Sequence, residues 1–263
     1  MITPADTPRT APPMRIAVAG GTGWIGRFVV EAAQAAGHTT TVISRSNGID
    51  LITGAGLPEA LRGASAVIDV SNITTTSRKK SVAFFGSATG NLIEAGRRAG
   101  VAHHVALSII GVDRVPLGYY EGKRRQEDLV LAGPVPATIL RAAQFHEFAA
   151  QLVERAAGPF VLAPRMRSQP IAAREVAEAL VRLAEREPAG LAPELAGPEQ
   201  LEMPDMVRRL LRARGSHRVT IALPLPGAAG KLLATGGLLP LEPGPRGRQT
   251  FGQWLTETAP PGR

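Results

Sequence analysis

A glycine-rich segment near the N-terminus has the residue types and the spacing that bind phosphate groups. It reads Gly20-Gly21-Thr22-Gly23-Trp24-Ile25-Gly26, with three glycines spaced three residues apart. Glycine permits a tight turn, lets the backbone approach a pyrophosphate closely and lets the following helix pack against its strand. Free amides at the start of that helix would bind the diphosphate of a dinucleotide. An ordinary glycine-rich turn is the alternative. We expect cofactor contacts from Gly20, Thr22, Gly23, Trp24, Ile25 and Gly26.

A basic residue occupies the position that distinguishes the two nicotinamide dinucleotides. An NAD site usually has Asp or Glu at the end of the second strand, where it accepts hydrogen bonds from the ribose hydroxyls. Here the position reads Ser44-Arg45-Ser46, and no acidic residue lies between Glu31 and Asp50. A guanidinium pairs with a 2′-phosphate. Arg45, helped by Ser46, therefore favours NADP(H), unless Arg45 is a solvated loop residue.

The elements around the glycine-rich segment are those that such a site requires. The pattern predicts a strand over 14–19, a helix over 24–36 and a β-branched strand over 39–43. This order is the βαβ unit of a parallel sheet. We expect further strands at 48–51, 66–70, 104–107 and 137–140, and helices at 84–99, 121–132 and 145–156. The alternation predicts an α/β fold of the Rossmann type, with a doubly wound parallel sheet.

The domain organisation follows from where this alternation starts and stops. Residues 1–13 are rich in Pro and Thr and are predicted to be a disordered tail, and residues 14–263 a single domain. Within it, 14–157 would form the nucleotide-binding core. The less regular 158–263, with helices predicted at 174–187, 204–214 and 249–256, would mainly form a small C-terminal cap over the substrate.

Composition narrows the classes of function. The chain has no cysteine, which excludes disulfides, thiolate metal sites and a cysteine nucleophile. No metal site is predicted, because the histidines have no partners at ligand spacing. The net charge is +8, but aromatic residues make up only 4%, so nucleic acid is an unlikely partner. No apolar run approaches the roughly 18 residues of a membrane span, and the N-terminus lacks a signal-peptide centre. We therefore expect a cytoplasmic protein without a membrane partner.

Three segments together are similar to a known family. They are Ala19 to Gly26 with Arg45 after it, Val105-Ala106-Leu107-Ser108-Ile109-Ile110-Gly111-Val112, and Leu140-Arg141-Ala142-Ala143-Gln144-Phe145-His146-Glu147-Phe148. The chain resembles the short-chain dehydrogenase/reductase superfamily from about residue 14 to residue 187. The glycine spacing is that of its extended and atypical branches, which include the NmrA-like NAD(P)H-binding proteins.

The resemblance implies a catalytic set. The superfamily uses Tyr-x-x-x-Lys with an upstream Ser, and Tyr119, Lys123 and Ser108 match that pattern. A nearby ammonium is expected to lower the pKa of the phenol, and the same lysine can contact the nicotinamide ribose. Serine would hold the substrate oxygen while the phenol exchanges a proton with it. The adjacent Tyr120 leaves open which ring faces the site.

Further candidates follow from the expected topology. Ser71 and Asn72, in a loop after a strand, should run beside the cofactor riboses. Asp50 resembles the acidic residue that meets the adenine amino group in this family. Gln144 and His146 follow the last core strand, where the substrate should lie.

The leading interpretation is an NADP(H)-dependent oxidoreductase that acts on a small carbonyl or conjugated substrate. Two alternatives stay open, because one fold supports all three functions. The first is a non-catalytic, NmrA-like regulator that senses NADP(H). The second is a redox-neutral epimerase, dehydratase or cyclase. A homodimer through the helices at 84–99 and 121–132 is a further possibility.

Overall fold

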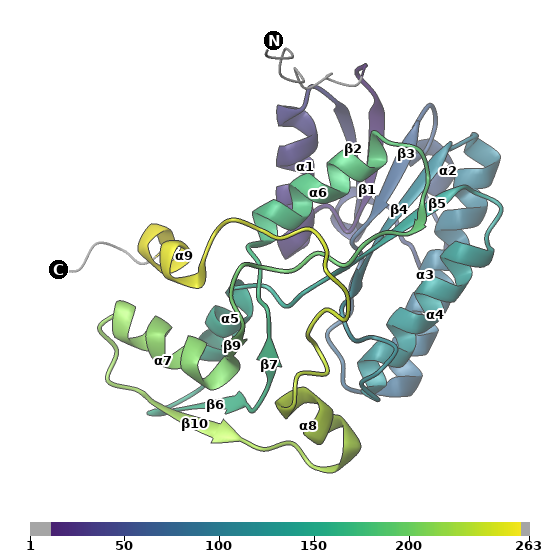
Figure 1. The fold of residues 1–263 in the computed structure, drawn as a ribbon. Coiled ribbons are helices and arrows are strands. Elements are labelled where there is room, and N and C mark those ends of the chain that lie inside the picture. The colour runs from purple at the N-terminus through teal and green to yellow at the C-terminus, as the bar shows by residue number, and fades with distance from the viewer. Residues whose placement is uncertain (1–11, 259–263) are drawn as a thin grey trace, which may run out of the picture.

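The computed structural model describes residues 12–258 and is built around a six-stranded parallel sheet (Figure 1). The strand order is β2-β1-β3-β4-β5-β8. Their bounds are β1 Arg15–Ala19, β2 Thr39–Ile43, β3 Ala66–Asp69, β4 His103–Ile109, β5 Ala137–Ala142 and β8 Gly190–Leu191. The order reverses direction between β1 and β3, as in a doubly wound sheet. The expected α/β fold of the Rossmann type is confirmed.

Helices cover both faces of this sheet because the buried strands are apolar on both sides. In β1, Ile16 and Val18 pack against α1 (Trp24–Ala35) and α6 (Ala173–Ala184). The alternate residues of β1 face the other layer, which contains α2, α3 and α4. That layer comprises α2 Leu57–Ala60, α3 Arg78–Ala99 and α4 Gly118–Ala132. No helix in the described range is long and apolar enough to cross a membrane.

The C-terminal region has a second apolar core of its own beside the carboxyl ends of the strands (Figure 1). Its helices are α5 Glu147–Arg155, α7 Met203–Ala213, α8 Gly227–Ala234 and α9 Phe251–Thr258. Its strands are β6 Phe160–Pro164 with β10 Val219–Leu223, which pair in parallel, and β7 Arg167–Ser168 with β9 Leu201–Glu202, which pair antiparallel. Helix α6 and strand β8 instead belong to the main sheet layers, so the chain after residue 158 contributes to both parts.

The structure differs from the sequence expectations at three elements. No strand forms at 48–51, because Gly48 and Gly54 adopt positive φ angles and the chain turns there. A short 3₁₀ turn, η1 (Arg45–Asn47), directly precedes Gly48. Helix α3 begins at Arg78, where Ser77 caps it by accepting from the amide of Lys80, rather than at residue 84. Helix α4 begins at Gly118 rather than at residue 121. Residues 1–11 of the expected tail lie outside the described residues.

Candidate functional site

The glycine-rich segment forms a turn that only glycine permits. Gly20 follows β1 with a φ of +80°, and a Cβ there would lie 2.9 Å from Cα of Ser71. Its amide donates to the carbonyl oxygen of Ile43 at 2.9 Å. The turn therefore lies against the ends of both β2 and β3.

The start of α1 is an open cradle of backbone amides. A Cβ on Gly26 would overlap the carbonyl oxygen of Gly20, so glycine is needed for the helix to pack this closely. Gly23 is the N-cap, and it provides no side-chain cap. The first amides of a helix have no intrahelical acceptor, and they carry the positive end of the helix dipole. These amides are at the position where the sequence predicts that a diphosphate binds.

The residues expected to contact the adenosine half lie at the end of β2. Arg45 is exposed, and no ion pair to it occurs within residues 12–258. The hydroxyl of Ser46 pairs with that of Ser44 at 2.9 Å. Asp50 uses Oδ1 to accept from the amide of Ile52 at 2.7 Å, so it stabilises the local turn. Asp50 follows a turn and not the expected strand.

Close packing of α3 against α4 sets the position of the tyrosine–lysine segment. A Cβ on Gly122 would overlap Ser81, so the two helices touch through backbone at this point. The hydroxyl of Ser81 also donates to the carbonyl oxygen of Tyr119 at 2.8 Å. Tyr119 and Lys123 are therefore fixed on the sheet-facing side of α4 by glycine and serine residues that themselves do no chemistry.

The two adjacent tyrosines point to different loops. Tyr119 donates from its hydroxyl to Oδ1 of Asn72 at 2.7 Å, in the loop after β3 beside the glycine turn. The hydroxyl of Tyr120 accepts from Nε2 of Gln144 at 3.3 Å, after β5, and its ring is buried in the C-terminal core. Tyr119 is thus the ring directed toward the loop beside the glycine turn. Burial raises the pKa of both phenols. The expectation that Lys123 lowers the pKa of Tyr119 is wrong, because loss of hydration dominates.

Lys123 is buried beneath Tyr119 and held by two acceptors. Its Nζ donates to the carbonyl oxygen of Leu107 at 2.5 Å and to Oε1 of Gln126. Gln126 in turn donates to Oδ2 of Asp69 at 2.8 Å. Burial lowers the pKa of Lys123 to about 8, and the nearby carboxylates of Asp69 and Glu127 oppose that shift. No motif in the sequence predicts this Asp69–Gln126–Lys123 chain of hydrogen bonds, because a glutamine inside a helix has no characteristic pattern.

Two serine hydroxyls at the site are buried and have no partner within the described residues. They are Oγ of Ser108, near the end of β4, and Oγ of Ser71, just after β3. An unpaired buried hydroxyl costs free energy, so each such group calls for an explanation, for example a bound water or a catalytic role. Both residues are among those that the sequence analysis expects to contact substrate or cofactor.

His146 has a different environment from the one expected of a substrate ligand. Its ring is 1% exposed, and its Nε2 lies 3.1 Å from the carbonyl oxygen of Gln249. The rings of Phe251 and Trp254 on α9 lie 5.5 and 6.1 Å away. Burial lowers the pKa of His146, which favours the neutral form of the ring. The contacts of His146 are thus with α9, whereas its neighbour Phe145 packs on Trp24 of the glycine turn at 5.6 Å.

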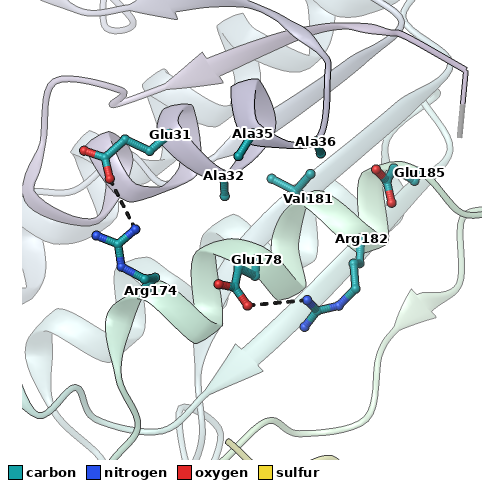
Figure 2. A pocket seen from close by; sticks show the side chains of 9 residues that line it. All are labelled: Glu31, Ala32, Ala35, Ala36, Arg174, Glu178, Val181, Arg182 and Glu185. Carbon is teal, nitrogen blue, oxygen red and sulfur yellow. Dashed lines mark ion pairs between the residues drawn. The ribbon is translucent and has the colours of Figure 1, made fainter. Parts of the chain in front are cut away.

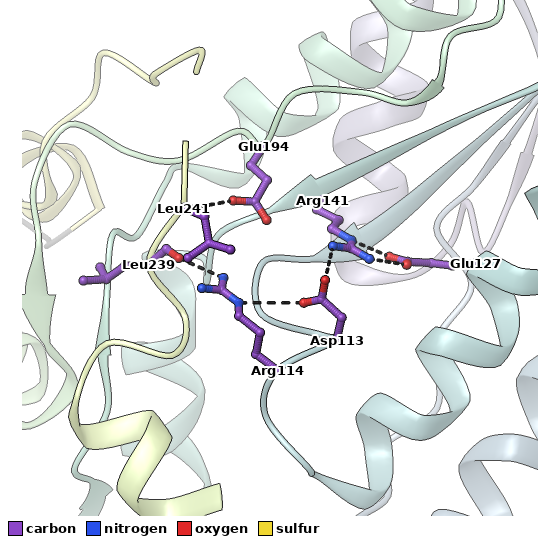
Figure 3. A network of polar contacts seen from close by, with 7 residues as sticks. All are labelled: Asp113, Arg114, Glu127, Arg141, Glu194, Leu239 and Leu241. Atoms are coloured by element: carbon purple, nitrogen blue, oxygen red, sulfur yellow. Dashed lines mark hydrogen bonds and ion pairs between the residues drawn. The ribbon is translucent and has the colours of Figure 1, made fainter. Parts of the chain in front are cut away.

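An ion-pair network fixes the loop after β4 beside the candidate site (Figure 3). Arg141 on β5 makes a two-pronged contact with Glu127 at 3.0 and 2.7 Å and a further contact with Asp113 at 2.7 Å. Arg114 extends the network to the carbonyl oxygen of Leu239 at 2.9 Å. The loop that follows Ser108 is thereby tied to α4 and to the C-terminal region.

A surface groove between α1 and α6 lies apart from these residues (Figure 2). It has a volume of about 480 Å³ and is lined by alanines of α1 and by charged side chains of both helices. Glu31 pairs there with Arg174 at 3.5 Å across the groove. No residue of the glycine turn lines it, so it is not the dinucleotide site.

Comparison with known proteins identifies the family. Residues 20–187 match the model of the NAD(P)H-binding family, which covers more than half of the chain. The chain belongs to this NAD(P)H-binding family. The matched range nearly coincides with the resemblance to short-chain dehydrogenases/reductases noted above, which is confirmed. No curated protein shows significant sequence similarity to the chain.

Solved structures of this fold span several reactions. A new type of NADPH-dependent quinone oxidoreductase from Escherichia coli has 19% identity and a TM-score of 0.62, with 92% of this chain and 98% of that one covered. A short-chain dehydrogenase/reductase superfamily protein from Agrobacterium tumefaciens with bound NAD has 19% identity and a TM-score of 0.66, with 93% and 96% covered. UDP-N-acetylglucosamine 4-epimerase from Bacillus cereus has 18% identity and a TM-score of 0.69, with 93% and 94% covered. At these identities the likeness is one of fold.

Proposed function

We propose that this member of the NAD(P)H-binding family is an NADP(H)-dependent reductase of small carbonyl or conjugated compounds. The observation that carries the proposal is the placement of Tyr119 and Lys123 one turn apart on α4. The phenol of Tyr119 reaches Asn72 at the sheet edge that also carries the glycine turn. A proton donor and a cofactor ligand are then available beside the expected position of the nicotinamide.

The residues of the sheet edge fit the parts of NADP(H). The amides at the start of α1 would hold the diphosphate, and Arg45 with Ser46 would hold the 2′-phosphate. Ser71, Asn72 and Lys123 would contact the riboses, since Lys123 has one ammonium hydrogen left after its two bonds within the protein. The bound dinucleotide supplies the hydride.

The chemistry of the protein is then to orient the substrate oxygen and to deliver a proton. The unpaired hydroxyl of Ser108 would donate a hydrogen bond to that oxygen. Tyr119 would give its phenolic proton to the same oxygen as the substrate carbon gains a hydride, so that a C=O group becomes CH–OH. A phenol is protonated at neutral pH, which suits the reducing direction, whereas burial raises the pKa of Tyr119 and so makes it a weaker acid.

One observation favours the second candidate, a regulator that binds NADP(H) without chemistry. The hydroxyl of Tyr119 and the ammonium of Lys123 are each engaged with groups of the protein, Asn72 for the first and Gln126 for the second. A sensor needs the fold and the glycine turn only.

Oxidation of NADPH in the presence of aldehydes, ketones, quinones and enones separates the two candidates. The reductase proposal predicts turnover with at least one class and its loss in Tyr119→Phe. Tight NADPH binding with no turnover across the whole panel would instead support the sensor.

A further inference from the structure

The carboxylate of Asp69 lies inside the fold at the end of β3, where two donors hold it. Asp69 is 1% exposed. Its Oδ1 accepts from the amide of Ser71 at 2.9 Å, and its Oδ2 accepts from Nε2 of Gln126 at 2.8 Å. A buried carboxylate is stable when hydrogen bonds and an opposite charge together compensate for its lost hydration. The two bonds supply the first, so a cation must supply the second.

Lys123 supplies the balancing charge. It is 4% exposed, and the carboxylates of Asp69 and Glu127 oppose the lowering of its pKa by burial. Its Nζ also lies 4.8 Å from the centroid of the Phe85 ring on α3, which favours the charged form. His104 on the neighbouring strand β4 interacts with the charge of Asp69 as well, but burial lowers its pKa and favours the neutral ring.

Gln126 joins the two charges as a neutral bridge. It is 1% exposed, and both ends of its amide are used, since Oε1 accepts from Nζ of Lys123 and Nε2 donates to Asp69. Turning the amide over would place its NH₂ group against the ammonium and its oxygen against the carboxylate. Repulsion at both ends therefore allows one orientation only. Gln126 thus fixes the ammonium relative to the carboxylate.

The same carboxylate connects Lys123 to the loop after β3. Ser71 donates its amide to Asp69, and the next residue, Asn72, accepts from the phenol of Tyr119. The loop, the phenol and the ammonium are thus tied into one hydrogen-bonded set.

We propose that Gln126 and Asp69 are positioning residues, which balance the charge of the Lys123 ammonium and fix its place so that its third hydrogen is left for the cofactor ribose. The role toward the ribose rests on the proposed function, whereas the hold on Lys123 does not. Stability alone does not require this arrangement, because apolar side chains in place of a buried charge pair are often neutral or stabilising.

A pH titration of the lysine ¹³Cε resonances in the unliganded protein tests the hold on Lys123. The chain has four lysines, and the other three, Lys79, Lys80 and Lys231, are exposed. Burial lowers the pKa of Lys123 to about 8, whereas exposed lysines titrate near about 10.4. Lys123 should therefore give the one resonance with a low midpoint.

Two variants should lower this midpoint further. Asp69→Asn removes the charge, and Gln126→Met replaces the bridge by an apolar side chain of similar length. In each, the midpoint should fall by about one pH unit or more, since the ammonium loses the carboxylate or the acceptor that favours it. The two changes lie on different elements, so each tests the inference without the other.

Thr89→Val is the matched control. It removes a buried hydroxyl of α3 that has no hydrogen-bond partner within residues 12–258, so the Lys123 midpoint should stay as in wild type. An unchanged midpoint in Asp69→Asn and Gln126→Met, or an equal shift in Thr89→Val, would overturn the inference.

NADPH titrations of the same proteins at pH 6 and pH 8 test the role toward the cofactor. A midpoint one unit lower cuts the charged fraction of Lys123 at pH 8 from about a half to about a tenth, so NADPH should bind about fivefold more weakly. At pH 6 Lys123 is charged in every variant, and the loss should be smaller. An equal loss at both pH values, as packing damage would produce, or no loss at either, would overturn the positioning role. A wild type that binds no NADPH would contradict the proposed function instead, and the midpoints would still decide the hold on Lys123.

Discussion

Tyr119 donates its phenolic hydrogen to Oδ1 of Asn72 at 2.7 Å and so joins the first turn of α4 to the loop after β3. Asn72 follows the strand that lies beside β1, whose end carries the glycine turn. This contact singles out Tyr119 over Tyr120, whose hydroxyl pairs with Gln144 in the direction of the C-terminal core.

Replacing Tyr119 by Phe should abolish turnover while NADPH affinity stays within about twofold. The change removes the proton donor, and general acid catalysis contributes roughly 10²–10⁴-fold. Steady-state kinetics with the best substrate of the panel and a fluorescence titration with NADPH check the two parts. Tyr120→Phe is the matched control and should retain most activity. Full activity in Tyr119→Phe, or equal losses in both variants, would contradict the assignment.

The glycine turn should tolerate no Cβ at Gly26. Gly26→Ala places a methyl group against the carbonyl oxygen of Gly20, so α1 must shift away from the turn. We expect NADPH affinity to fall at least about tenfold, with a loss of stability of about 1–3 kcal/mol. Gly86→Ala is the control, since a Cβ there meets nothing within 4 Å. In the middle of α3 it should be neutral or stabilising by up to about 1 kcal/mol. Unchanged NADPH affinity in Gly26→Ala would contradict the proposal that the backbone amides at the start of α1 bind the diphosphate.

Because of Glu147, the free energy of unfolding should fall as the pH rises from the acidic to the neutral range. Burial raises its pKa from 4.5 to about 7, against the opposing effect of the hydrogen bond from Trp254. Between these values the folded state binds more protons than the unfolded state, so the free energy of unfolding decreases with pH from about 4.5 to 7. Glu147→Gln keeps an acceptor for Trp254 and removes the carboxylate. At pH 8 it should be more stable than wild type by up to about 3 kcal/mol.

Urea denaturation of wild type and Glu147→Gln at pH 5 and pH 8 measures this effect. The stability difference between the two proteins should be small at pH 5 and larger at pH 8. A difference that stays constant over this range would show that Glu147 ionises normally in the folded protein.

The main sheet could be predicted from the sequence because its strands are short apolar runs between helices of clear periodicity. From residue 14 to residue 43 the chain forms a strand, a glycine turn, a helix and a β-branched strand. Each of these elements has a local pattern in the sequence that predicts it. The expected strand at 48–51 is wrong, because Gly48 adopts left-handed backbone and the turn bonds of Asp50 outweigh the apolar pattern. The starts of α3 and α4 were missed because neither first turn continues the apolar period of its helix.

The candidate site was only partly predictable. The glycine turn and the tyrosine–lysine spacing are local, and the structure brings both to one edge of the sheet. The bonds of Lys123 to Leu107 and Gln126, and the burial that raises the pKa of Tyr119, depend on how α3 and α4 pack. The contacts of His146 are out of reach of the sequence for the same kind of reason, since α9 returns from about 100 residues further along the chain to contact it. Tertiary contacts of this range leave no pattern in a single sequence.

Arg45 offers the most direct test of the central claim that the chain binds NADP(H) through this sheet edge. Wild type and Arg45→Ala are titrated with NADPH, NADP⁺, NADH and NAD⁺, with Arg182→Ala on α6 as a control for loss of a surface arginine. Loss of one arginine–phosphate contact should weaken NADPH binding roughly 10–100-fold and leave NADH binding unchanged. Wild type that binds NADH as tightly as NADPH would contradict the preference for the phosphorylated cofactor, and binding of none of the four would contradict the central claim itself.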